Sequence, residues 1–139
     1  MKNHQGWLRA SLKGCRFKGR MLGCEFGAHF ADEGERGSVE DCDFSEARLD
    51  LCRFHSCDTR TLRFPRWPSF TILDPIGNGR ELTGVKWPGS FRPVTLEGPY
   101  KELPSTVALT FYAPTEAKRS GTTEEELKAA IERFNFIVH

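Results

Sequence analysis

The sequence lacks the features that would mark a membrane, secreted or nucleic-acid-binding protein. No apolar run reaches the roughly 20 residues that a membrane-spanning helix needs, and no secretion signal opens the chain. Neither sign of charge dominates, since 20 basic residues stand against 19 acidic ones and the formal net charge is +1. These absences predict a cytoplasmic protein that binds neither membrane nor nucleic acid.

The cysteines lack the spacing of a metal site or a disulfide framework. There is no C-x-x-C pair, and an odd number of cysteines without a secretion signal argues against disulfides. Each cysteine stands two places before a Phe or a Thr, at positions Cys15, Cys24, Cys42, Cys52 and Cys57. One position repeated five times indicates a structural, reduced interior residue, so we expect neither a metal nor another cofactor.

Catalytic residues are equally sparse. His4 and His139 lie near the ends, and neither His29 nor His55 has a nucleophile or a carboxylate at a spacing that indicates an acid–base pair. We therefore predict that the protein is not an enzyme. The alternative left open is a small enzyme with a cleft between its first and second halves.

What the sequence does contain is a period of five over residues 37–64. The third place of each block is apolar or Thr: Val39, Phe44, Leu49, Phe54, Thr59 and Phe64. The first place is mostly small or Cys: Gly37, Cys42, Ala47, Cys52, Cys57 and Leu62. A period of five fits neither an α-helix nor a flat strand. It predicts a chain that turns once per block and stacks one coil on the next.

This pattern resembles the pentapeptide-repeat family over about residues 5–64. The resemblance implies a mainly β fold, a short right-handed four-sided β-helix whose interior holds the residues named above. Some relatives bind topoisomerases by imitating DNA with a strongly acidic rod. Because the charge of this chain is balanced, a topoisomerase-interacting protein is only an alternative here.

Two domains are expected to pack as one unit. The β-helix would occupy residues 1–64, with a loop insertion near 27–36. Two prolines, Pro65 and Pro68, then end the repeats. The second segment, 65–139, would cap the open end of the β-helix.

Within the second segment, two similar stretches at 66–74 and 86–97 are expected to be corner-plus-strand units joined by a tight turn at Asn78-Gly79. Residues 106–112 alternate as a half-buried strand does, and 118–121 are expected to form a loop. A helix over 122–135 is indicated by an apolar stripe and a capping pattern at its start.

The function predicted from these features is binding of one protein partner, a toxin or an enzyme, by a bacterial immunity-type inhibitor. A rigid wall of mixed charge suits a specific protein partner. The predicted contact residues are outward-facing positions of the repeats together with one Trp: Arg48, Asp50, Leu51, Arg53, His55, Arg60, Arg63 and Trp67.

Overall fold

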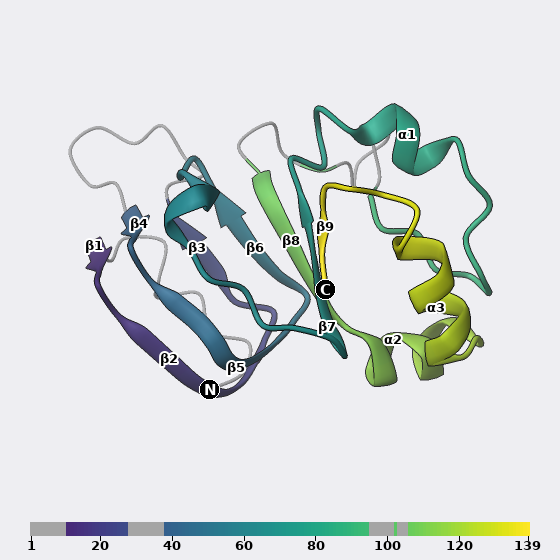
Figure 1. Cartoon of the computed structure of the whole chain (residues 1–139), viewed down its shortest axis with the longest axis horizontal. Coiled ribbons are helices and arrows are strands. Elements are labelled where there is room, and N and C mark those ends of the chain that lie inside the picture. Colours follow the sequence, from purple (N-terminus) through teal and green to yellow (C-terminus); the bar gives the residue numbers. More distant parts are fainter. Residues whose placement is uncertain (1–10, 28–37, 95–101, 103–105) are drawn as a thin grey trace.

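The computed structural model describes residues 11–27, 38–94, 102 and 106–139. The predicted loop insertion near 27–36 falls outside these ranges, apart from Gly27. The described chain is mainly β, with its α-helices gathered at one end (Figure 1). Its strands are β1 (Ser11–Lys13), β2 (Arg16–Leu22), β3 (Glu25–Gly27), β4 (Ser38–Glu40), β5 (Asp43–Asp50), β6 (Cys52–His55), β7 (Ser69–Leu73), β8 (Thr106–Tyr112) and β9 (Ile137–Val138). Its helices are a 3-10 turn, η2 (Thr59–Thr61), and α1 (Gly79–Thr83), α2 (Ala113–Ser120) and α3 (Glu124–Ile131).

The N-terminal half contains two similar sets of three strands, β1 to β3 and β4 to β6. β1, β2 and β3 pair in parallel with β4, β5 and β6 respectively. The chain turns between strands at residues with positive φ, which are Gly14, Gly23, Asp41 and Leu51. Glycine adopts this conformation at little cost, whereas Leu51 (φ 54°) is strained there.

The predicted β-helix is wrong. Blocks of five would give short, equal sides, but β2 has 7 residues and β5 has 8, so neighbouring blocks merge into one strand. The parallel pairs β1–β4 and β2–β5 form separate two-stranded sheets, and the third pair joins a mixed sheet. The fold is therefore a set of small sheets with no solenoid among the described residues.

A five-stranded sheet joins the two halves of the chain. Its order is β3-β6-β8-β7-β9, with β3 parallel to β6 and the other neighbours antiparallel. The strand expected at 106–112 is confirmed as β8, which lies at the centre of this sheet. The C-terminal β9 pairs with β7, so the apolar tail is held by sheet hydrogen bonds rather than stacked over an open coil.

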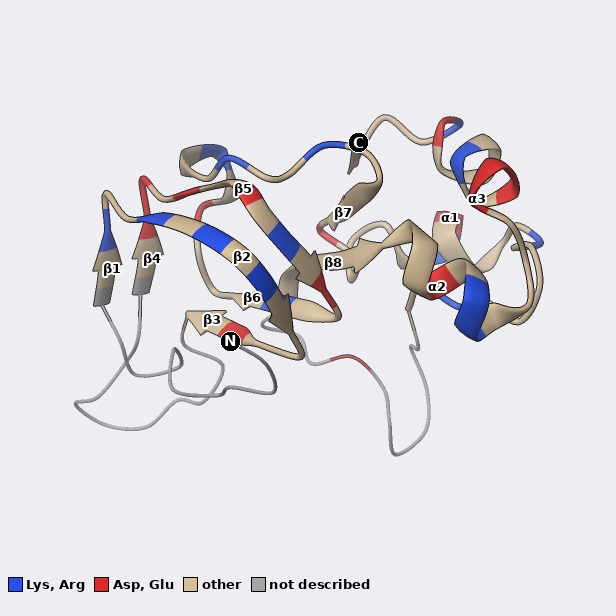
Figure 2. Ribbon diagram, turned by 90° about the horizontal axis from the view of Figure 1, so that it is seen from below, with Lys and Arg blue, Asp and Glu red and all other residues tan. Residues whose placement is uncertain are grey.

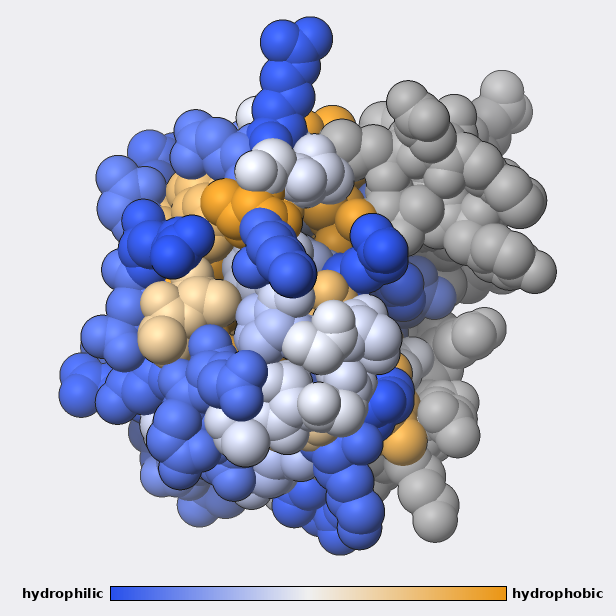
Figure 3. Space-filling view, turned by 90° about the vertical axis from the view of Figure 1, so that its right-hand side faces the viewer, coloured by the Kyte–Doolittle hydropathy of each residue, from blue (hydrophilic) through white to orange (hydrophobic). Residues whose placement is uncertain are grey.

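The helical end differs from the sequence-based expectation in four places. Asn78 precedes α1 instead of forming a hairpin turn, and 86–94 contains no strand. α2 occupies part of the region expected to be a loop. The helix expected at 122–135 is present but shorter, as α3, with Thr123 as its N-cap. Mostly hydrophilic residues cover this end, around smaller apolar areas (Figure 3).

Buried side chains form two clusters. The first lies between the N-terminal sheets and contains the phenylalanines of the repeats: Phe17, Phe26, Phe44, Phe54 and Phe64. Most positions predicted to face inward are buried there, although Cys57 and Thr59 are only half-buried. The second cluster lies between the five-stranded sheet and the helices, around Phe70, Leu127 and Ile131. Within the part of the chain that the structure describes, no helix is long and apolar enough to cross a membrane.

Candidate functional site

The eight predicted contact residues do not form one surface. His55 is completely buried, with its Nε2 atom 3.0 Å from Oε1 of Glu25. Leu51 and Trp67 pack against the second cluster. These three residues therefore support the fold and present little surface to a partner.

The predicted arginines are also separated. Arg53 pairs with Glu102 at 2.8 Å, and Arg60 pairs with Asp58 at 2.9 Å. Arg63 is exposed, and its backbone bridges to Asp43. Two pairs of predicted residues come together: Arg48 with Asp50 at the end of β5, and Leu51 with Arg53 in the lining of a small pocket beside β8.

The pairing of β2 with β5 places three charged pairs side by side. Arg16 lies opposite Asp43, and Lys18 lies opposite Glu46 with its Nζ 3.2 Å from a carboxylate oxygen. The first two pairs have opposite charges, but the third places two like charges together, because Arg20 lies opposite Arg48. The basic residues of β2 and β5 are visible in Figure 2. Like charges directly opposite one another destabilise a sheet, so the third pair needs a separate explanation.

The two opposed arginines open onto a groove of about 390 Å³ between this sheet and α2. We call it the arginine groove and define it by its lining residues: Arg20, Met21, Leu22, Arg48, Asp50, Thr115 and Arg119. It brings three guanidinium groups together from three elements that are distant in sequence. Figure 2 shows charged residues on α2 as well as on β5.

Local contacts hold Arg48 in place. Its guanidinium carbon lies 3.7 Å from the centre of the Tyr112 ring, a cation–π contact. Its Nη2 atom donates to Oγ1 of Thr115 at 3.4 Å. Stacking on an aromatic ring fixes the plane of the guanidinium and leaves its edge available to a ligand. Tyr112 and Thr115 thus position Arg48 toward the groove.

Arg119 is positioned by two carboxylates of the chain itself. Its Nη1 donates to Oε2 of Glu116 at 2.6 Å, and its Nη2 lies 3.7 Å from Oδ2 of Asp50. Ser120 donates its hydroxyl to the other oxygen of Glu116 at 3.1 Å. With both carboxylates ionised, the three arginines still leave the groove with a positive balance.

Both carboxylates are held in partly dehydrated surroundings. Burial raises the pKa of Asp50, against the opposing effects of Arg119, the Tyr112 backbone N–H and Arg48. Burial likewise raises the pKa of Glu116, and the charge of Asp50 adds to it, while Arg119 and Ser120 oppose the rise. In addition, Oδ1 of Asp50 is buried without a hydrogen-bond partner of ordinary geometry among the described residues. The ionised form of Asp50 is therefore poorly stabilised by the fold.

Replacing Asp50 by Asn should change how stability depends on pH. A carboxyl whose pKa is higher in the folded state than in the unfolded state costs stability as pH rises above its unfolded value of about 3.9. Asp50→Asn should thus gain stability relative to the unmodified protein as pH rises from about 4 toward neutrality. Urea denaturation of both proteins at several pH values measures this difference.

Asp58→Asn provides the control, because the hydrogen bonds from Arg60 lower the pKa of Asp58. The charge of Asp58 stabilises the folded protein above the unfolded pKa, and this contribution is lost as pH falls. Asp58→Asn should therefore lose stability relative to the unmodified protein as pH rises from about 4 toward neutrality. Equal pH dependence for Asp50→Asn and the unmodified protein would contradict the account of the buried carboxylate.

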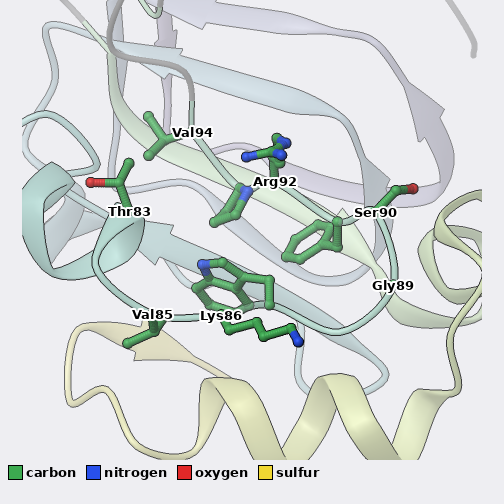
Figure 4. Close-up of a pocket in the computed structure, with 10 residues that line it drawn as sticks. Thr83, Val85, Lys86, Gly89, Ser90, Arg92 and Val94 are labelled. Carbon is green, nitrogen blue, oxygen red and sulfur yellow. The ribbon is translucent and has the colours of Figure 1, made fainter.

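A second pocket lies in the loop that follows α1. It has a volume of about 280 Å³ and is lined by Thr83, Val85, Lys86, Trp87, Gly89, Ser90, Phe91, Arg92, Pro93 and Val94. Figure 4 shows these side chains around the loop. Trp87 itself is committed to packing: its Nε1 donates to the Leu82 carbonyl at 2.6 Å and its ring contacts Phe91 and Phe134. Two basic residues, Lys86 and Arg92, line this pocket, against three arginines in the arginine groove, so the groove is the stronger candidate.

The cysteines belong to the first cluster or pack against it. Cys24, Cys42 and Cys52 are buried, and Cys15 and Cys57 are half-buried. Burial, with the nearby charge of Asp58, raises the pKa of Cys57 to about 12, which suppresses its reactive thiolate form. Over residues 11–27, 38–94, 102 and 106–139, no three His, Cys, Asp or Glu side chains converge on a possible metal position.

Sequence reasoning missed Arg20, Thr115 and Arg119. In the earlier part of the repeat region, Arg20 stands two places before Leu22, where the later blocks mostly have a small residue or Cys, and this departure was the available signal. Nothing in the sequence indicated that Arg119 would lie near β5. No family model, curated protein or solved structure matches this chain. The resemblance to the pentapeptide-repeat family therefore stays a prediction.

Proposed function

We propose that this protein is a non-catalytic binding protein that takes an acidic group of one protein partner into the arginine groove. The observation that carries the proposal is the Arg20–Arg48 pair, which stands next to two pairs of opposite charge on the same strands. The immunity-type or inhibitory role expected from the sequence is one form of this function. The contact surface proposed here is the groove instead of a repeat wall.

The groove concentrates positive charge from three side chains. Two arginines directly opposite each other repel, and Arg119 adds a third positive group to the same cavity. An anionic group placed between them would convert this repulsion into attraction. Hydrogen bonds from guanidinium to carboxylate or phosphate are among the stronger ones in proteins. The repulsion between the arginines, which destabilises the free protein, would thus be relieved in the complex.

Titration with a short glutamate-rich peptide tests the proposal by calorimetry. Arg48→Gln should weaken binding about 10-fold or more, as expected for losing a charged hydrogen bond of about 1.5–3 kcal/mol. Arg20→Gln should weaken it as well. Arg16→Gln is the matched control, because Arg16 is an exposed arginine of the same strand that already has Asp43 opposite it. Equal losses in Arg16→Gln and Arg48→Gln, or no binding of either this peptide or a phosphorylated one by the unmodified protein, would refute the proposal.

An enzyme acting on an anionic substrate is the second candidate function. It is favoured by the raised pKa values of Asp50 and Glu116, since a general acid needs a carboxyl that holds its proton. Binding is better supported because both Glu116 oxygens are engaged, one by Arg119 and one by Ser120. Turnover of an anionic substrate that disappears in Glu116→Gln would favour the enzyme.

A further inference from the structure

The three arginines of the groove differ in whether a carboxylate of the described residues lies close to them. Arg119 already has a carboxylate partner at hydrogen-bond distance, Glu116, and a second one nearby, Asp50. No carboxylate of the described residues lies within salt-bridge distance of Arg20 or Arg48, the two arginines of the sheet. An incoming anion would therefore bind mainly between these two, with Arg119 at the rim.

The donors around that position come from different elements. Neighbouring strands are about 4.8 Å apart, so Arg20 and Arg48 approach the anion from adjacent positions. Thr115, in the first turn of α2, lies on the other side of the groove. Tyr112, the N-cap of α2, provides no side-chain cap, and the charge at this end of the helix is met by Glu116 in its first turn.

We infer that the acidic group accepted by the arginine groove is a phosphomonoester, carried on a phosphorylated side chain of the protein partner. This inference rests on the proposed function and names its ligand. A phosphoryl group offers three acceptor oxygens and a charge of about −1.5 to −2 at neutral pH. Its tetrahedral oxygens match donors that come from two strands and a helix, whereas the two oxygens of a carboxylate lie in one plane.

Competition within the groove also favours phosphate. An acidic side chain of a partner would carry the same group as Glu116 and Asp50, which already interact with Arg119. A doubly charged group gains about twice the attraction from Arg20 and Arg48 at equal distance. Asp50 and Glu116 also repel it twice as strongly, so its net advantage over a carboxylate comes from the positive balance of the groove.

Three peptides of identical flanking sequence test this inference, with Ser, phosphoserine or Glu at the central position. Calorimetry at constant ionic strength should show the phosphoserine peptide binding at least about 10-fold more tightly than the Glu peptide. Arg48→Gln should abolish this preference, and Arg48→Lys should restore only part of it, since lysine lacks the forked geometry. Arg16→Gln should leave it unchanged.

Asp50→Asn tests the inference by strengthening binding, whereas the arginine substitutions weaken it. It removes a negative charge from the groove without replacing an arginine, so it should tighten binding of the phosphoserine peptide severalfold. A purely structural role for Asp50 would not produce this gain. Because the substitution removes a poorly stabilised buried charge, the variant should remain folded.

The outcomes separate the inference from the function on which it rests. Equal affinities for the phosphoserine and Glu peptides would overturn the phosphoryl inference and leave the proposed function standing. No binding of any peptide would overturn both. Binding of inorganic phosphate without binding of the phosphoserine peptide would identify a small phosphorylated metabolite as the source and overturn the protein partner.

Discussion

Replacing Phe54 by alanine is expected to lower the free energy of unfolding by about 3–5 kcal/mol. Phe54 is fully buried, and its ring contacts Phe26, Phe44 and Phe64 at centroid distances of 4.9, 5.1 and 5.3 Å. Truncation would leave a cavity in the middle of the first cluster, where three rings lose a neighbour at once. Urea denaturation followed by circular dichroism measures the loss.

Phe136→Ala is the control for this cavity. Phe136 is half-buried and has one ring contact, with Phe134 at 5.2 Å. Its removal should cost clearly less than the loss of Phe54. If both variants lost similar stability, the phenylalanine cluster would not be the principal support of the N-terminal half. Since domains of this size are stable by only about 5–15 kcal/mol, Phe54→Leu serves where Phe54→Ala does not fold.

Gly27→Ala is expected to be the second strongly destabilising change. Gly27 has φ of 84°, and an added Cβ would lie inside van der Waals contact with the carbonyl oxygen of His55. His55 is the residue opposite Gly27 in the parallel β3–β6 pair, so relieving the clash requires these strands to separate. We expect a loss of at least about 3 kcal/mol, which combines left-handed strain with backbone displacement.

Gly14→Ala separates these two causes. Gly14 has φ of 66°, but an added Cβ there meets nothing within 4 Å. It should therefore lose only the strain of a left-handed alanine, about 1–2 kcal/mol. Thermal unfolding of both variants gives the comparison. Equal losses would show that the contact between β3 and β6 is looser than the structure indicates.

The sequence revealed which side chains are buried better than it revealed how the strands connect. The period of five correctly marked Phe44, Leu49 and Phe54 as interior residues. It failed on the fold because burial repeats every five residues without the chain having to turn every five residues. In β5 the strand continues through a whole block, and the charged Glu46 and Arg48 face outward along it. The period of five alone does not indicate at which residues the chain changes direction.

The candidate site was less predictable than the core. Arg48 and Asp50 were identified as outward residues, but their partners come from β2 and α2, far away in the sequence. The opposition of Arg20 and Arg48 depends on a register shift between Arg16 and Lys18, a local irregularity that no sequence pattern announces. His55 was also misplaced: its side chain is fully buried, with Nε2 3.0 Å from Oε1 of Glu25 on the neighbouring strand β3.

The most direct test of the arginine groove is to follow the side-chain Nε–Hε signals of the arginines by NMR while adding the phosphoserine peptide. The account predicts saturable shifts for Arg20, Arg48 and Arg119, which line the groove. Arg60, fully engaged with Asp58, should not move. Small shifts of equal size at all arginines, growing without saturation, would show non-specific attraction and contradict the account.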